Sequence, residues 1–242
     1  MSAGSASERR TNARTAVVWD DLSDVLDGST LDVVDIGGGT GVSAVRVAQL
    51  GHRVTVVDPS PDALAALDRR AKESDVADRV TAQQGDLSSL LEVADPGSAD
   101  LVLCHGVLEV VDDPAAALAT IAQVLRPGGT LSLLVAQRHA AVIARAMAGH
   151  FQQARATLEG TDPVGRTGRR FTVEELDDLL HGAGLSVQAV HAVRVFTDLV
   201  PGSLLDLEPG ATAALVELEQ AVATRPEYLP LATQLHLLAH RP

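Results

Sequence analysis

A run of glycines constrains this chain more than any other feature of its sequence. The segment Asp35-Ile36-Gly37-Gly38-Gly39-Thr40-Gly41 follows an apolar stretch, 31–36, and precedes a segment rich in alanine and valine that ends near Leu50. Glycine tolerates positive φ and exposes bare backbone, and the first N–H groups of a helix have no partner inside that helix. The segment is therefore predicted to be a strand–turn–helix junction that can hold a nucleotide or nucleoside cofactor.

The spacing of these glycines distinguishes between two classes of cofactor. The dinucleotide fingerprint G-x-G-x-x-G requires a glycine at position 42, and the chain has Val42 there. This argues against a nicotinamide oxidoreductase and leaves other nucleoside cofactors. A plain turn between strand and helix, with no ligand, is the alternative interpretation of the glycine run.

Polar residues at the ends of three further predicted strands favour a bound cofactor. Asp58 ends the second strand, where a carboxylate can accept hydrogen bonds from both hydroxyls of a ribose. Gly85-Asp86-Leu87 follows the third strand, where the carboxylate can accept from an adenine amino group while the leucine packs on the ring. His105 ends the fourth strand, at the crevice in which open sheets bind ligands. The alternatives are a helix N-cap, a surface turn and a structural histidine, respectively.

Strands and helices alternate strictly up to residue 136, which predicts a Rossmann-like, doubly wound α/β sheet. Two later strands complete a mostly parallel sheet of seven strands. The region 137–182, after the fifth strand, is predicted to form a helical cap that contributes to the acceptor site. The expected strands are 31–36, 53–58, 79–84, 100–105, 130–136, 186–196 and 232–240.

The chain is expected to form one domain behind a short arm. Residues 1–12 are polar and predicted to be a flexible arm, and 13–26 has the apolar spacing of an amphipathic helix. No linker is long enough to divide 13–242 into two domains. Because aromatic residues make up only 2% of the chain, valine, leucine and alanine must fill the core, as suits buried parallel strands.

Charge and cysteine content argue against several kinds of partner. A net charge of −13 argues against non-specific binding of RNA or DNA through phosphates, although a local basic patch stays possible. Cys104 is the only cysteine, so no intrachain disulfide can form, and without a signal peptide the cytoplasm is the expected location.

No stretch reaches the roughly 18–20 apolar residues of a membrane span. The histidines show no metal-ligand spacing. We expect no DNA, membrane or metal partner, and either a monomer or a homodimer.

With these residues in place, the chain resembles class I S-adenosylmethionine (SAM)-dependent methyltransferases. Leu125-Arg126-Pro127-Gly128-Gly129 is similar to the turn before the fifth strand of that family, and the spacing of the glycine run fits its cofactor motif. Most of the chain further resembles one subgroup, the bacterial tRNA 5-carboxymethoxyuridine methyltransferases, which esterify a carboxylate on a modified wobble uridine. The segments that carry this second resemblance are 14–22, 105–110, 193–198, 215–219, 227–228 and 241–242.

The resemblance implies SAM as the cofactor, S-adenosylhomocysteine as its product, and a role for each candidate residue. Arg14 also stands out independently, since a cation at the start of a helix is disfavoured by the helix dipole unless it has an anionic partner; an ordinary solvated arginine is the alternative. The implied contacts are Arg14 with the methionine carboxylate, Gly37 and Gly38 with the amino-acid end (Asp35 and Gly39 share that loop), Asp58 with the ribose, Gly85, Asp86 and Leu87 with the adenine, and His105 on the side of methyl transfer.

Methyl transfer from a sulfonium needs mainly orientation and a water-poor site, because the donor is already activated by its charge. A carboxylate acceptor is ionised at neutral pH and needs no general base. It does need a cation to position it, and Arg194 is our candidate, with a salt bridge to Asp198 as the alternative. His105 is predicted to orient the acceptor, or to act as a base if the acceptor is a hydroxyl or amine.

Three hypotheses for the function follow. The first is methylation of a carboxylate or hydroxyl on a modified tRNA uridine, and the second is methylation of a small molecule, which the acidic charge favours. The third, a binding module without activity, conflicts with the intact loop and acidic residues. The region after the fifth strand is less basic here than in the tRNA-modifying subgroup. A contiguous arginine face formed by Arg166, Arg169, Arg170 and Arg194 would support tRNA, and a roofed apolar pocket would support a metabolite.

Overall fold

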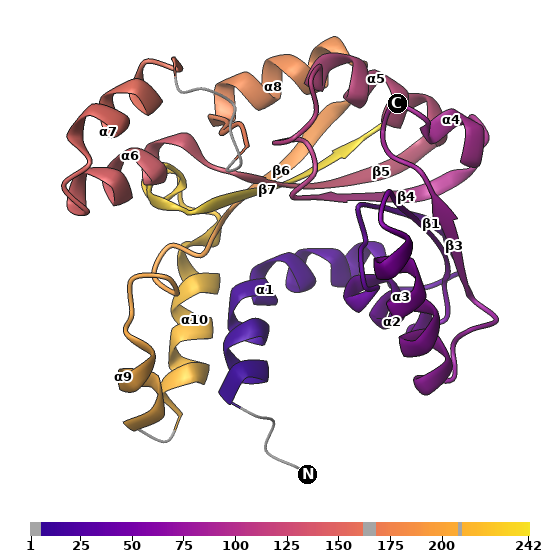
Figure 1. Cartoon of the computed structure of the whole chain (residues 1–242), viewed down its shortest axis with the longest axis horizontal. Coiled ribbons are helices and arrows are strands. Elements are labelled where there is room, and N and C mark those ends of the chain that lie inside the picture. Colours follow the sequence, from indigo (N-terminus) through magenta and orange to yellow (C-terminus); the bar gives the residue numbers. More distant parts are fainter. Residues whose placement is uncertain (1–5, 162–167, 208–209) are drawn as a thin grey trace. The chain divides into compact units, whose positions relative to one another are not determined.

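The computed structural model describes residues 6–161, 168–207 and 210–242, which contain a single mixed sheet with helices (Figure 1). The seven strands in this part of the chain follow the order β3-β2-β1-β4-β5-β7-β6. They are β1 (Asp32–Ile36), β2 (Arg53–Asp58), β3 (Val80–Gln84), β4 (Ala99–His105), β5 (Leu125–Ala136), β6 (Ser186–Val193) and β7 (Gln234–His240). The helices are α1 (Ala6–Val25), α2 (Val42–Gln49), α3 (Pro61–Glu73), α4 (Leu90–Val93), α5 (Pro114–Val124), α6 (Arg138–Met147), α7 (Phe151–Leu158), α8 (Val173–Gly182), α9 (Gly202–Leu207) and α10 (Ala211–Ala223), with a 3₁₀ helix at Leu229–Leu231.

The chain divides into two compact units, which we describe separately. The glycine-loop unit comprises Val25–Val135, Glu174–Ala189 and Leu237–Pro242. The α1 unit comprises Met1–Asp24, Ala136–Val173 and Val190–His236. No helix in the described part of the chain combines the length and the apolar character that crossing a bilayer requires.

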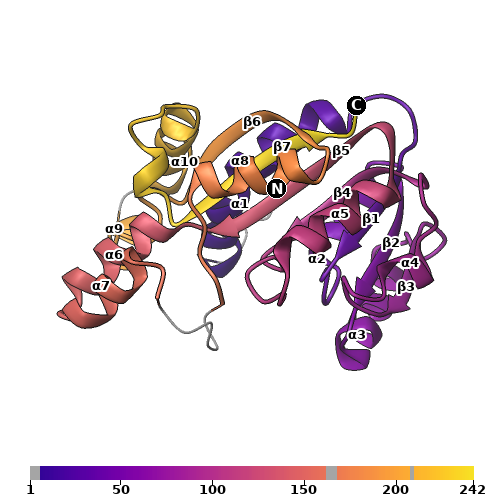
Figure 2. The same ribbon diagram turned by 90° about the horizontal axis from the view of Figure 1, so that it is seen from above.

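Parallel strands bring the predicted loop and strand ends to one edge of the glycine-loop unit. In β1, Ile36 pairs with Val57 of β2 and with Cys104 of β4. The residues that follow them, Gly37, Asp58 and His105, therefore lie side by side at the same edge of the sheet. The central strands are apolar and almost continuously buried, as expected for parallel strands covered on both faces. Figure 2 shows α2 and α3 beside this part of the sheet, where they contact β2 and β3.

The sheet is mixed because β7 runs antiparallel to β5. At one end, the Gly128 N–H donates to the Arg241 carbonyl at 2.7 Å, and the Arg241 N–H donates back to Gly129 at 3.0 Å. At the other end, the Gln137 N–H donates to the Thr233 carbonyl at 3.0 Å. The prediction of seven strands is thus confirmed, and the late strand accounts for the departure from a purely parallel sheet.

The turn predicted at 126–129 is instead an irregularity inside β5. Ala99 pairs with Leu125 while Leu101 pairs with Thr130, so four residues of β5 bulge out between two successive pairs. Gly128, with a φ of 79°, supplies the left-handed conformation that the bulge needs. The fifth strand therefore begins at Leu125, five residues earlier than the sequence suggested.

Two other element boundaries differ from prediction. The first helix begins at Ala6, so residues 6–12 of the expected arm are helical, and residues 1–5 lie outside the described part. The stretch 139–158, expected to be continuously helical, is two helices, α6 and α7, separated at Gly149, whose φ is 78°. A buried residue, Phe171, closes this region by pairing with Gln137 in an isolated parallel bridge.

Candidate functional site

The glycine loop between β1 and α2 leaves no room for a side chain at Gly37, Gly38 or Gly41. Gly37, Gly39 and Gly41 have φ values of 68°, 55° and 77°, a region that favours glycine. A Cβ on Gly38 would lie 2.5 Å from Oδ2 of Asp35, and one on Gly37 would clash with the side chain of Val107. Helix α2 begins at this loop without any side-chain cap. The loop therefore presents bare backbone and unpaired helix N–H groups, as predicted.

Asp58, at the end of β2, is fixed against this loop. Its Oδ2 accepts a hydrogen bond from the Gly39 N–H at 3.0 Å, and its Oδ1 accepts from the Ser60 N–H at 2.9 Å. The alternative in which Asp58 caps α3 is wrong, because the N-cap is Ser60, whose Oγ accepts from the Ala63 N–H at 3.2 Å. Each carboxylate oxygen has a second lone pair with which to accept from a ligand hydroxyl.

Asp35 lies under the same loop in a very different setting. Its side chain is buried, and within the described residues its Oδ2 has no hydrogen-bond partner. Burial, and secondarily the charge of Asp58, raises the pKa of Asp35 to about 7. An acidic group that titrates near neutral pH therefore lies directly behind Gly38.

A cavity of about 630 Å³ opens beside the loop within the glycine-loop unit. Its walls are mostly apolar, with the buried Leu87 among them. They comprise Ile36, Gly37, Val57, Pro59, Asp86, Leu87, Ser88, Val107, Val110, Val111, Asp112, Asp113, Ala116, Ala117 and Thr120. Its position next to the ends of β1 and β2 fits the planar, largely apolar base of a nucleoside.

Asp86 lines this cavity and also stabilises its own turn. Its Oδ1 accepts from the N–H of Ser88 at 2.8 Å and from the Ser88 hydroxyl at 2.6 Å. These bonds lower the pKa of Asp86, so the side chain is a carboxylate at neutral pH. The preceding Gly85 is bonded through its N–H to the Asp58 carbonyl at 3.3 Å, which ties the two strand ends together.

His105, at the end of β4, is partly buried and is held within the sheet. Its Nε2 lies 2.8 Å from the hydroxyl of Ser132 on the neighbouring strand β5. The next residue, Gly106, has a φ of 71° and turns the chain toward the cavity residue Val107. The bond to Ser132 is a structural role for His105, and it also fixes the imidazole ring at the strand end. This role is compatible with the predicted role of His105 in orienting the methyl acceptor.

The structure thus brings together most of the predicted site residues at one edge of the glycine-loop unit. The other two belong to the α1 unit. The group at the strand ends is Asp35, Gly37, Gly38, Gly39, Asp58, Gly85, Asp86, Leu87 and His105. Their roles toward a ligand stay predictions.

Arg14 and Arg194 are bound to one carboxylate in the α1 unit. Arg14 Nη2 donates to Asp198 Oδ1 at 3.2 Å, and Arg194 forms an ion pair with Asp198 Oδ2. Arg194 Nη1 also donates to Gln234 Oε1 at 3.1 Å, while its buried Nε has no hydrogen-bond partner in the described part of the chain. The alternative in which Arg194 pairs with Asp198 is confirmed. The expectation that Arg14 starts a helix is wrong, because α1 begins at Ala6 and Arg14 lies about two turns inside it, so the helix dipole does not single it out. Its anionic partner is the same carboxylate.

A residue that we did not predict organises the segment carrying these charges. Glu219 of α10 is 1% exposed and accepts bonds from three successive backbone N–H groups. Oε2 binds the Val195 N–H at 2.9 Å, and Oε1 binds the Phe196 and Thr197 N–H groups at 2.9 and 2.7 Å. Strand β6 accordingly ends at Val193 instead of 196, because these N–H groups point to Glu219 and Arg194 has a φ of 61°.

A sequence signal for Glu219 did exist. It lies four residues after Leu215 and three before Val222, and both of these are buried on α10. An acidic residue in the middle of an apolar helix face needs an internal partner, which predicts a buried carboxylate.

The predicted arginine face stays a prediction. Arg166 lies outside the described residues, and Arg194 is bound to Asp198. Arg169 and Arg170 are partly exposed, and the Arg170 carbonyl accepts from Arg138 Nη2 at 3.1 Å.

Known proteins are similar to this chain over the glycine-loop region and, in some cases, over almost the whole chain. The family described as "Methyltransferase domain" matches residues 34–133. A tRNA 5-carboxymethoxyuridine methyltransferase of Escherichia coli O157:H7 is 32% identical over 95% of this chain and 88% of its own length. A ubiquinone biosynthesis O-methyltransferase of Xanthomonas campestris is 36% identical, but over 53% of each chain.

Solved structures support the same fold. Geranyl diphosphate C-methyltransferase from Streptomyces coelicolor, crystallised with Mg²⁺, geranyl diphosphate and S-adenosylhomocysteine, aligns with a TM-score of 0.63 at 18% identity. The alignment covers 94% of this chain and 79% of that one. At this level of identity the similarity establishes the fold alone.

Proposed function

Because the chain belongs to the SAM-dependent methyltransferases, in the family of the bacterial tRNA 5-carboxymethoxyuridine methyltransferases, we propose that it methylates the carboxylate of a 5-carboxymethoxyuridine in tRNA. The observation that carries this proposal is the extent of the similarity. The relative that acts on a small molecule matches about half of the chain, whereas the tRNA methyltransferase matches 95%, including segments outside 34–133.

The residues of the glycine-loop unit fit SAM. When bound, SAM supplies a methyl group activated by the positive charge of its sulfur. We assign the backbone of Gly37, Gly38 and Gly39 to its amino-acid end and Asp58 to its ribose hydroxyls. Support comes from the positive φ values, from the clash that a Cβ on Gly38 would cause, and from the fixed orientation of Asp58.

The adenine is assigned to the cavity beside the loop. Leu87 and Val107 supply apolar contacts there, and Asp86 supplies a carboxylate that can accept from the adenine amino group. Its Oδ1 is bonded to Ser88, so we assign the contact to Oδ2.

A carboxylate acceptor needs to be oriented and its charge balanced, and it needs no proton removed. We assign Arg194 to the acceptor carboxylate, Arg14 to the methionine carboxylate of SAM, and His105 to orienting the acceptor. The buried Nε of Arg194 has no hydrogen-bond partner among the residues that the structure describes. It supports an anionic ligand, because a buried donor without a partner is costly. Residues 137–182, which include α6 and α7, are assigned to acceptor binding.

Methylation of a small molecule is the second candidate. A net charge of −13 favours it over a nucleic-acid partner. The two candidates differ in one outcome. A tRNA methyltransferase transfers the methyl group to tRNA, whereas a small-molecule methyltransferase leaves both modified and unmodified tRNA unlabelled.

The experiment uses full-length protein, SAM with a labelled methyl group, and one tRNA prepared with and without 5-carboxymethoxyuridine. We expect label only in the modified tRNA, and we expect mild alkali to release it as methanol, because hydroxide cleaves an ester and leaves an ether intact. Asp58→Ala is the inactive control. SAM binding without labelling of tRNA would move the acceptor to a metabolite, and label that survives alkali would move it to a hydroxyl.

A further inference from the structure

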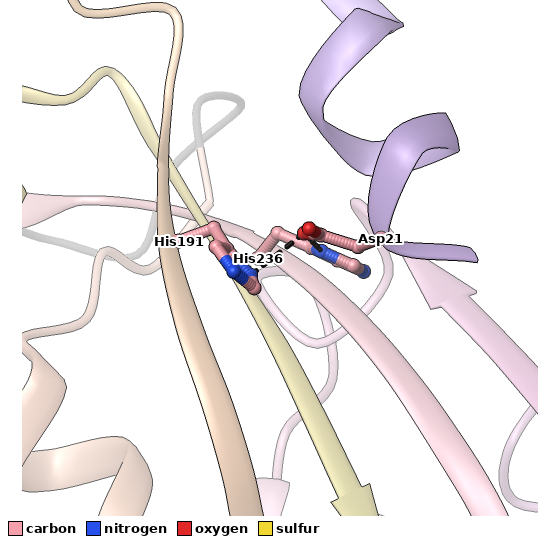
Figure 3. Close-up of side chains that lie close together, drawn as sticks. All are labelled: Asp21, His191 and His236. Atoms are coloured by element: carbon pink, nitrogen blue, oxygen red, sulfur yellow. Dashed lines mark hydrogen bonds and ion pairs between the residues drawn. The ribbon is translucent and has the colours of Figure 1, made fainter. Parts of the chain in front are cut away.

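Three potential metal ligands that are far apart in the sequence meet in the α1 unit (Figure 3). They are Asp21 on α1, His191 on β6 and His236 on β7. Nδ1 of His191 lies 2.6 Å from Oδ2 of Asp21, and Nδ1 of His236 lies 2.9 Å from the same oxygen. One potential ligand atom from each residue lies within 4.8 Å of the others.

The surroundings of this cluster suit a specific site. The side chains of Asp21, His191 and His236 are 14%, 11% and 0% exposed, so the cluster is nearly buried and Asp21 and His191 keep a small exposed area. The imidazole rings stack with centroids 6.1 Å apart and an angle of 26° between their planes, which turns both Nδ1 atoms toward Asp21. None of the three residues has a role in the proposed methyl transfer.

The donor set has a well-defined preference. Two imidazole nitrogens and one carboxylate oxygen bind divalent ions such as Zn²⁺ and Fe²⁺, and three protein ligands leave coordination positions open to water. Calcium and magnesium prefer oxygen ligands and do not suit this set. The carboxylate also offsets part of the charge of a divalent ion.

We propose that Asp21, His191 and His236 form a binding site for one divalent ion of the Zn²⁺ class. Ligands about 2.0–2.2 Å from a zinc ion at tetrahedral angles lie roughly 3.3 Å apart. The two O–N distances of 2.6 and 2.9 Å would therefore have to lengthen by roughly 0.7 and 0.4 Å when the ion binds.

An ion at this site would fix α1 against two strands of its own unit. Asp21 follows Arg14 by seven residues, which is nearly two helical turns, so both lie on the same face of α1. The α1 unit would then be held at two places along this face, by the ion at Asp21 and by the ion pair between Arg14 and Asp198. The inference does not depend on which acceptor the enzyme methylates.

The test is metal binding by the full-length, tag-free protein after treatment with a chelator and desalting. Zn²⁺ is titrated by calorimetry, and Co²⁺ is followed by its visible d–d absorption, which reports the coordination geometry. We expect one ion per chain and a higher midpoint of thermal unfolding in the presence of Zn²⁺. Absence of stoichiometric binding would overturn the proposal and leave a purely hydrogen-bonded cluster.

Matched variants separate this site from adventitious binding to other histidines. We expect His191→Gln and Asp21→Asn to lose the Co²⁺ spectrum and the thermal shift. His52→Gln is the control, since His52 is also buried but is bonded to Leu26 and Leu31 in the glycine-loop unit. Circular dichroism checks that each variant is folded. Equal binding by Asp21→Asn and the unchanged chain would overturn the proposal.

Discussion

Carboxyl groups at the glycine loop are used differently from those in the α1 unit. At the glycine loop, Asp58 accepts two backbone hydrogen bonds, and the buried Oδ2 of Asp35 has no partner in the described residues. In the α1 unit, Asp198 pairs with two arginines, and Glu219 accepts hydrogen bonds from three successive backbone N–H groups. The carboxyl groups at the glycine loop keep acceptor capacity for a ligand, whereas Asp198 and Glu219 form internal cross-links.

This contrast implies two kinds of response to mutation. Removing a carboxylate from the glycine loop should weaken ligand binding more than stability. Removing one from the α1 unit should lower stability first, because it leaves buried donors without an acceptor.

Glu219→Ala should have the largest effect. It leaves three backbone N–H groups and the Thr197 hydroxyl without their acceptor in a buried place. At about 1–3 kcal/mol for each unsatisfied group, partly relieved by water, we expect the free energy of unfolding to fall by about 4 kcal/mol. Urea denaturation measures it, with Glu217→Ala on the exposed face of α10 as the control. A loss below about 1 kcal/mol would contradict the cross-linking role.

Asp58→Ala should come next and act on binding. Loss of two hydrogen bonds from ribose hydroxyls to a carboxylate, at about 1.5–3 kcal/mol each, predicts SAM affinity lower by a factor of about 10² to 10⁴. Calorimetric titration with SAM and S-adenosylhomocysteine measures the change. Asp62→Ala, an exposed acidic residue in the first turn of α3, should bind both normally. Unchanged affinity in Asp58→Ala would refute the assignment of Asp58 to the ribose.

Asp35→Asn should show its effect through pH. The pKa of Asp35 is raised from 3.8 to about 7, so between these values the folded state keeps a proton that the unfolded state has lost. The free energy of unfolding of the unchanged protein should therefore fall as pH rises through this window, and then level off. Asparagine does not titrate, so the free energy of unfolding of Asp35→Asn should lack this dependence on pH.

The comparison of these two proteins isolates Asp35. Between pH 5 and pH 8, the stability of the unchanged chain relative to Asp35→Asn should fall by on the order of 2 kcal/mol. Denaturation curves at several pH values measure this difference. Parallel curves for the two proteins would mean that Asp35 does not titrate in this range.

The same contrast explains which parts of the molecule could be predicted. The glycine loop, Asp58 and the strand ends are specified by residues that are close in the chain and by periodic burial, so local patterns suffice. Parallel strands then bring these ends together by rule. The bulge in β5 escaped prediction because Pro127, Gly128 and Gly129 also fit an ordinary turn.

The cross-links of the α1 unit that join residues far apart in the chain could not be found in this way. Arg14 lies 184 residues from Asp198, and Asp21 lies 215 residues from His236, so no spacing rule connects them. The histidines show no metal-ligand spacing in the sequence, but spacing does not bear on ligands that only the fold assembles. Two contacts had a local signal. Arg194 and Asp198 lie four residues apart, and Glu219 is an acid on an apolar helix face.

Asp198→Asn should have the smallest effect on stability and the most informative one on Arg14. Asp198 is 23% exposed and pairs with Arg14, which is 53% exposed, and with Arg194, which is 23% exposed. Ion pairs that water can reach contribute roughly 0–1 kcal/mol each, and asparagine keeps an oxygen that can accept from one of the two arginines. We expect a loss of stability of about 1 kcal/mol that shrinks as salt is added. SAM affinity should change far less than in Asp58→Ala.

Combining Asp198→Asn with Arg14→Gln then decides what Arg14 does. If Arg14 binds the methionine carboxylate, Arg14→Gln should weaken SAM binding about equally in the presence and absence of the Asp198 carboxylate. If Arg14 serves only to bind Asp198, its effect should disappear once that carboxylate is gone, because the two substitutions then remove one and the same contact. Calorimetry on the four proteins of this cycle distinguishes a ligand-binding cation from a second internal cross-link, and the second result would extend the rule of the α1 unit to its first helix.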